Sequence, residues 1–180
     1  TLSLFLTLTL SLPPRPAAAQ PPDVGKPAPD FVLRDLDGAK VSLSDMAYPG
    51  PAKPGHPKKT VVLDFFRTDC APCRKELPAV AKYAEDHRKD GVEVLLVALL
   101  EDDDGEAKLR TFLAANPVPF RVVTDPYELA AKRYVCDGSS VTLPSLFLVD
   151  REGVLRRHVK GLDSDVERAL GPLDNPRDLP

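Results

Sequence analysis

Two cysteines separated by two residues are the side chains of this sequence best suited to covalent chemistry. Cys70 and Cys73 enclose Ala71 and Pro72, directly after a continuous apolar run at residues 60–66. If that run is a buried strand and a helix begins near Cys70, its thiol lies among free backbone N–H groups at the positive end of the helix dipole. These groups stabilise a thiolate, and cysteines in such settings titrate at about 3.5–7.5 instead of about 8.5.

This placement favours thiol–disulfide exchange. An exposed Cys70 thiolate attacks a substrate disulfide, and Cys73, turned towards the protein, resolves the mixed disulfide. Pro72 occupies a first-turn position, where its missing N–H costs no hydrogen bond. Two alternatives remain, half of a zinc site and a purely structural disulfide. Zinc is disfavoured because the sequence has no second pair of this spacing and its three histidines are scattered.

The elements that must position the cysteines alternate between strand and helix. Apolar patterning predicts strands at 31–33, 41–43, 60–66, 92–99, 120–123, 145–149 and 154–159, and helices at 70–89, 107–115, 126–134 and 163–170. The first two strands form a hairpin around a turn at Asp37-Gly38. Residues 48–59 read as a loop rich in proline and glycine. This order predicts an α/β protein with a mixed central β-sheet flanked by helices on both faces, with an added N-terminal β-hairpin.

Composition narrows the class of protein further. A chain of 180 residues with 43% hydrophobic and 28% charged residues has the make-up of one folded domain and excludes wholesale disorder. The net charge of −3 argues against a nucleic-acid partner. Three cysteines are too few for a disulfide scaffold, and the sequence contains no tryptophan.

The first twenty residues have the pattern of a secretory signal. An apolar run at residues 2–12 precedes Pro13-Pro14 and an Ala-rich site ending at Ala19, and the run is too short to span a membrane. We therefore expect residues 1–20 to be a signal peptide with a truncated basic region, 21–170 the folded domain and 171–180 a tail. The protein would then be secreted or periplasmic, or alternatively anchored to the membrane by an uncleaved N-terminal segment.

Residues 65–78 resemble the active-site segment of the thioredoxin-like superfamily, more narrowly the secreted TlpA/ResA branch of thiol–disulfide oxidoreductases, related to AhpC/TSA and redoxin proteins. Residues 29–43 are similar to that branch's N-terminal hairpin, 143–150 to its cis-proline segment and 150–153 to its D-x-x-G turn. The resemblance covers about residues 24–170. It implies a thioredoxin-like fold and a monomer without metal or cofactor beyond the Cys70–Cys73 disulfide. The implied partners are protein thiols and disulfides, with a membrane electron donor and apocytochrome c as further candidates, and the usual direction is reduction.

The resemblance also implies catalytic roles for four residues. Cys70 matches the attacking cysteine, Cys73 the resolving cysteine and Pro144 the cis-proline. Glu76 matches an acidic residue near the pair, where a half-buried carboxylate would accept the proton of Cys73. Its alternative is an ordinary surface carboxylate on the helix. Asp64, in the apolar run, is a second carboxylate under the site, or else a paired structural acid.

Substrate contacts are expected from the residues around the pair. The backbone of Leu143 would hydrogen-bond an extended substrate, and Ala71, Pro72 and Asp69 would line its path. The family usually has tryptophan where this chain has Asp69. That negative charge should raise the pKa of Cys70 and make the couple more reducing, unless Asp69 merely caps the helix.

Two other classes of protein, a peroxidase and a copper carrier, are alternatives to a thiol–disulfide oxidoreductase. A peroxiredoxin-like peroxidase needs a threonine three residues before its reactive cysteine, whereas Thr68 stands two before Cys70. A thioredoxin-like copper carrier uses a C-x-x-x-C pair, one residue longer than the pair present here.

Cys136 is expected to be a buried free thiol, with a regulatory thiol or an intermolecular disulfide as alternatives.

Overall fold

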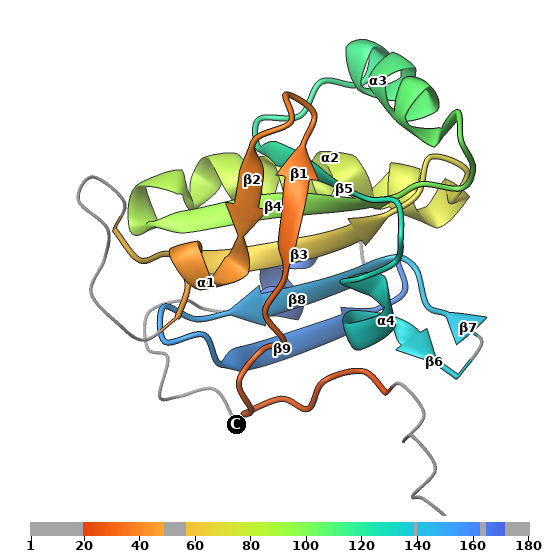
Figure 1. Ribbon diagram of the computed structural model, residues 1–180. Helices are drawn as coiled ribbons and strands as arrows, with labels where there is room; N and C mark the ends of the chain where they lie inside the picture. The colour runs from red at the N-terminus through yellow and green to blue at the C-terminus, as the bar shows by residue number, and fades with distance from the viewer. Residues whose placement is uncertain (1–19, 49–56, 139, 163–164, 172–180) are drawn as a thin grey trace, which may run out of the picture.

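The computed structural model describes residues 20–48, 57–138, 140–162 and 165–171 (Figure 1). Most of three predicted segments lies outside these residues: all but the last residue of the expected signal peptide, residues 49–56 of the loop predicted at 48–59, and all but the first residue of the expected tail. Within the described part of the chain, no helix has the length and apolar character needed to cross a membrane.

A seven-stranded mixed sheet forms the centre of the molecule. Its strand order is β2-β1-β5-β4-β3-β8-β9, with β3, β4 and β5 parallel and the remaining neighbours antiparallel. The strands are β1 Val32–Asp35, β2 Lys40–Ser42, β3 Thr60–Phe66, β4 Val92–Leu99, β5 Arg121–Asp125, β8 Ser145–Val149 and β9 Leu155–Lys160. A separate two-stranded sheet pairs β6 Cys136–Asp137 with β7 Ser140–Val141. The predicted mixed sheet and N-terminal hairpin are confirmed.

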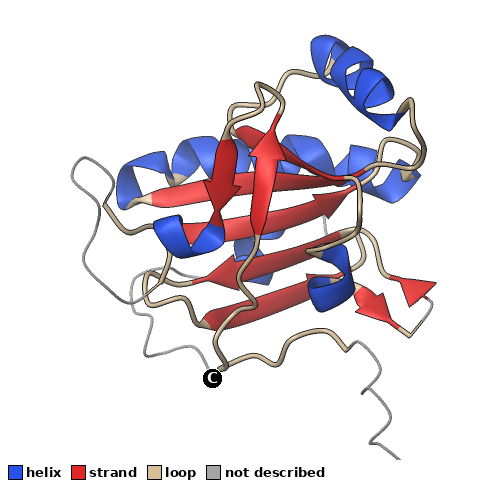
Figure 2. Ribbon diagram, in the orientation of Figure 1, coloured by secondary structure: helices blue, strands red, loops and turns tan. Residues whose placement is uncertain are grey.

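Helices cover both faces of this sheet, as Figure 2 shows. They are α1 Leu43–Met46, α2 Ala71–Asp86, α3 Gly105–Ala115, α4 Ala131–Tyr134 and α5 Val166–Leu170, with a 3₁₀ turn at Arg88–Asp90. In the figures α2 lies behind the sheet and α1 and α4 lie in front of it, while the hairpin strands β1 and β2 extend the sheet beyond β5. The arrangement is the thioredoxin-like fold that the sequence predicts.

Burial on both faces explains why β3 is apolar throughout. Val61, Leu63 and Phe65 pack on the front face into a cluster with residues of the hairpin, α1 and α4. Val62 and Phe66 point to the opposite face, where they pack with residues of α2. A strand buried on both sides cannot show the alternation of polar and apolar residues seen in a surface strand.

The structure corrects the boundaries of several predicted elements. The helix expected at 126–134 begins only at Ala131, because the Asp125 carboxylate accepts hydrogen bonds from the N–H groups of Leu129, Ala130 and Ala131 and holds the preceding residues in a turn. The helix expected at 70–89 ends at Asp86, where the 3₁₀ turn follows. The short helix α1 and the β6–β7 pair were not predicted.

Candidate active site

Cys70 lies where β3 passes into α2, at the N-cap position of that helix. Its backbone is extended, with φ −77° and ψ 99°, and its Sγ accepts a hydrogen bond of 3.2 Å from the N–H of Cys73. Ala71 and Pro72 form the first helical positions, so the proline leaves no helical hydrogen bond unmade. The first-turn N–H groups and the helix dipole favour negative charge on this sulfur.

The two cysteines form a disulfide and differ in exposure. The S–S distance is 2.05 Å and the two Cα atoms are 5.3 Å apart. Cys73 is 2% exposed, whereas Cys70 is partly exposed and Ala71 and Pro72 are exposed. The geometry therefore offers Cys70 to an incoming sulfur and keeps Cys73 as the inner thiol.

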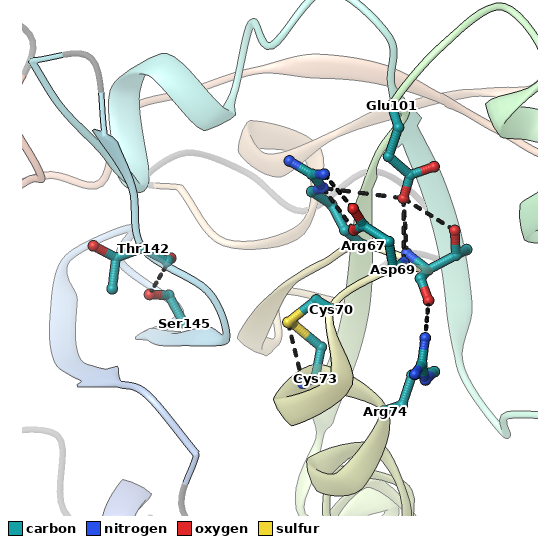
Figure 3. The surroundings of a disulfide bond; sticks show 9 residues. Arg67, Asp69, Cys70, Cys73, Arg74, Glu101, Thr142 and Ser145 are labelled. Carbon is teal, nitrogen blue, oxygen red and sulfur yellow. Dashed lines mark hydrogen bonds and ion pairs between the residues drawn. A yellow bond between two sulfur atoms is a disulfide. The ribbon is translucent and has the colours of Figure 1, made fainter.

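A cis peptide bond joins Leu143 to Pro144, the isomer that the resemblance implies. Figure 3 shows the neighbouring Thr142 and Ser145 across from the disulfide, with the Ser145 hydroxyl donating to the Thr142 carbonyl at 2.9 Å. Leu143 is partly buried and packs against the cluster that contains Cys73 as well as the front-face cluster. Both hydrophobic clusters thus hold the segment around Leu143 in place beside the cysteines.

Two buried carboxyl groups come from the elements that carry the cysteines. Glu76, on α2 one turn after Cys73, and Asp64, on β3, are each 2% exposed. Asp64 shares its face of β3 with Val62 and Phe66, which pack with residues of α2. Burial, reinforced by the charge of Glu76, raises the pKa of Asp64 well above its usual range. The alternative of Glu76 as a surface carboxylate is wrong.

Asp69 lies at the surface beside Cys70 and is held by Arg67. The guanidinium donates from Nε to the Asp69 carboxylate at 3.0 Å, and this hydrogen bond lowers the pKa of Asp69. The alternative that Asp69 caps α2 is wrong, because Cys70 is the capping residue. The positive charge of Arg67 offsets part of the negative charge that Asp69 places beside Cys70.

Glu101 is a site residue that the sequence did not reveal. Residues 101–105 read as a solvated acidic turn, yet the Glu101 side chain is only 15% exposed. Its Oε1 accepts from the N–H and hydroxyl of Thr68 at 3.1 and 3.0 Å and from the N–H of Asp69 at 3.4 Å (Figure 3). The one available signal was its place after a parallel strand, since carboxyl ends of neighbouring parallel strands meet at one sheet edge.

Cys136 is a free, buried thiol in β6, as expected. Burial is the main cause that raises its pKa, with a further contribution from the charge of Glu128. Among the described residues, no group of three or more histidine, cysteine, aspartate or glutamate side chains is arranged to hold a metal ion.

A redox-capable cysteine pair at a helix start, with a cis-proline directly before β8 of the same sheet, defines a thioredoxin-like dithiol–disulfide protein. The family model described as AhpC/TSA family matches residues 24–158. The chain belongs to the AhpC/TSA family, and within it to the ResA-type thiol–disulfide oxidoreductases.

Individual relatives agree with this assignment. "Thiol-disulfide oxidoreductase ResA" of Bacillus subtilis (strain 168) is 34% identical over 140 residues, covering 76% of this chain and 67% of the relative. The protein of the same name from Bacillus thuringiensis subsp. konkukian (strain 97-27) is 30% identical over 139 residues, covering 77% and 70%. The crystal structure of a putative thiol:disulfide interchange protein DsbE from Chlorobium tepidum matches with a TM-score of 0.65 and 29% identity, covering 83% of this chain and 99% of that one.

Proposed function

We propose that this oxidoreductase reduces disulfides of protein substrates outside the cytoplasm, with Cys70 as the attacking cysteine. The observation that carries the proposal is the difference between the two sulfurs. Cys70 is partly exposed and caps α2, while Cys73 is buried beside it. The secretory pattern of residues 1–20 supports the compartment, where protein disulfides are common.

The reaction is a two-electron exchange between dithiol and disulfide. The Cys70 thiolate attacks a substrate disulfide, forms a mixed disulfide and releases one substrate thiolate, which takes up a proton. Cys73 then loses its proton, attacks the Cys70 sulfur and releases the second substrate thiolate. The protein ends oxidised and the substrate gains two electrons and two protons. A separate electron donor must then reduce the Cys70–Cys73 disulfide.

The buried carboxyl groups suit the second step. Cys73 is too buried to give its proton directly to water, and Glu76 lies one helical turn further along α2. Because burial and the charge of Glu76 disfavour ionisation of Asp64, the two carboxyl groups are suited to holding a proton at neutral pH and passing it on. We assign Glu76 as the proton acceptor for Cys73, with Asp64 as its buried neighbour.

The charges near Cys70 support the reducing direction. Asp69 and the buried carboxyl pair oppose a thiolate, and a less stable thiolate favours the oxidised protein. Substrates would lie in an extended conformation across the exposed Ala71 and Pro72, hydrogen-bonded to the backbone of Leu143. A membrane electron donor is the candidate partner that reduces the Cys70–Cys73 disulfide, and apocytochrome c is the candidate substrate.

Reduction of insulin by dithiothreitol tests the central claim. Wild type should accelerate the reaction, and Cys70→Ser should not, whereas Cys136→Ala should behave as wild type. Cys73→Ser should accumulate a mixed disulfide with the substrate, visible by non-reducing electrophoresis. Equal rates for wild type and Cys70→Ser would contradict the proposal, and consumption of hydrogen peroxide in place of insulin reduction would favour a peroxidase. Fractionation of cells that express the tagged protein tests the compartment.

A further inference from the structure

The turn that leads into Cys70 is held by polar contacts from two sides. The Cys70 N–H donates to the Arg67 carbonyl at 3.2 Å, closing the turn. Glu101 accepts the N–H groups of Thr68 and Asp69 together with the Thr68 hydroxyl, and Arg74 of α2 donates to the Thr68 carbonyl (Figure 3). Both the N–H and the carbonyl of Thr68 are therefore tied to side chains from other elements.

Glu101 reaches this turn from the neighbouring strand. It stands two residues after the end of β4, and β3 and β4 run parallel with Phe66 opposite Ala98, so the two strands end at the same edge. With only 15% of its side chain exposed, Glu101 is largely shielded from competing water. Hydrogen bonds to an ionised carboxylate are about twice as strong as those between neutral groups.

Asp69 adds no apolar packing to this turn, although Cys70 itself packs against the cluster that contains Cys73. The Asp69 side chain is 59% exposed and paired with Arg67, so it contributes no buried apolar contact next to Cys70. We propose that Glu101 is the positioning residue for Cys70: its carboxylate fixes the Thr68–Asp69 turn so that the Cys70 sulfur keeps its N-cap position, accepting the Cys73 N–H, once the disulfide opens. The inference depends on the proposed function only for the role of Cys70 as attacking cysteine.

Two substitutions at Glu101 separate positioning from charge. Glu101→Gln keeps an acceptor oxygen for the turn but loses the negative charge, whereas Glu101→Ala loses both. Since neither variant carries the charge, the pKa of Cys70 should be higher in Glu101→Ala than in Glu101→Gln. Glu106→Ala is the matched control, because Glu106 is an exposed carboxylate of α3 paired with Arg110 of the same helix.

The measurement is the pH dependence of iodoacetamide alkylation of the reduced protein, with Cys70 identified by peptide mass spectrometry. At neutral pH we expect Cys70 in Glu101→Ala to react about tenfold more slowly than in Glu101→Gln, which corresponds to about 1.4 kcal/mol. Glu106→Ala should match wild type. Equal Cys70 pKa values in the Ala and Gln variants overturn the proposal. Because no protein substrate is involved, this result stands apart from the outcome of insulin reduction.

A milder variant decides the case if Glu101→Ala does not fold. Thr68→Val removes only the hydroxyl donor to Glu101 and should raise the Cys70 pKa in the same direction by a smaller amount. Thr111→Val is its control, since the Thr111 hydroxyl donates to Ala107 within α3. A Cys70 pKa that is the same in Thr68→Val and wild type would then overturn the proposal.

Discussion

Opening the Cys70–Cys73 disulfide should make the folded protein less stable. The bond closes a loop of only four residues, and loop-closure entropy for that length disfavours the oxidised unfolded chain by about 1.9 kcal/mol. In the reduced folded state, the helix dipole stabilises the thiolate by about 0.3–1 kcal/mol, which offsets part of this. We therefore expect the oxidised protein to be more stable than the reduced one by about 1–1.5 kcal/mol.

The same difference supports the proposed reducing direction. By the thermodynamic cycle linking folding and reduction, a disulfide that stabilises the folded state is harder to reduce there than in the unfolded chain. An increment of about 1–1.5 kcal/mol corresponds to roughly 20–30 mV towards a more reducing couple. A protein with a disulfide of this kind is suited to donating electrons.

Urea unfolding of the oxidised and dithiothreitol-reduced protein measures this difference. Far-UV circular dichroism is the appropriate probe because the sequence has no tryptophan. Both forms should carry Cys136→Ala, so that the free thiol does not exchange with the disulfide in the unfolded chain. A reduced form that is more stable than the oxidised form would refute the reasoning and favour an oxidant.

Three further predictions concern charged groups. The pKa of Asp64 is raised in the folded protein, so ionisation of Asp64 destabilises the fold as pH rises above about 3.9, the pKa of aspartate in an unfolded chain. Asp64→Asn should therefore raise the melting temperature near pH 8 but not near pH 4. An equal change at both pH values would contradict this. Burial opposes protonation of His87, but its contacts with Glu167 and Asp90 together outweigh burial and raise its pKa. The stability from these contacts is complete below about pH 6.5 and is lost as pH rises through the folded pKa, so unfolding of His87→Gln should depend less on pH between 6 and 8. Asp69→Trp should lower the pKa of Cys70, followed by thiolate absorbance, and a rise or no change would contradict the role given to Asp69.

Local sequence signals were sufficient for the centre of the fold. The signals for the apolar β3 and for the start of α2 at the cysteine pair come from consecutive residues, and both elements lie where they were expected. The helix at 126–134 was overestimated because a single carboxylate, Asp125, captures three N–H groups that would otherwise belong to a turn of helix. Helical propensity does not take into account this competition of a side chain for backbone N–H groups.

Site residues brought together across the chain were harder to predict. Glu101 and Thr68 are 33 residues apart, and only the parallel pairing of β3 with β4 makes them neighbours. Glu76 was placed near the cysteines by resemblance, but its burial depends on how α2 packs on the sheet. The ion pair between Asp69 and Arg67 could likewise not be predicted, since the Arg67 side chain could equally have pointed to solvent.

The two ends of the central sheet bear on how this protein behaves at high concentration. An open strand edge is a template for pairing with another copy. At one end β2 has only three residues, and at the other β9 carries Arg156, Arg157 and Lys160. The start of β9 is also covered, because Leu155 exchanges backbone hydrogen bonds with Gly25 and Lys26. Short length, positive charge and a covering segment all discourage edge-to-edge aggregation, which suits a protein expected to work as a monomer.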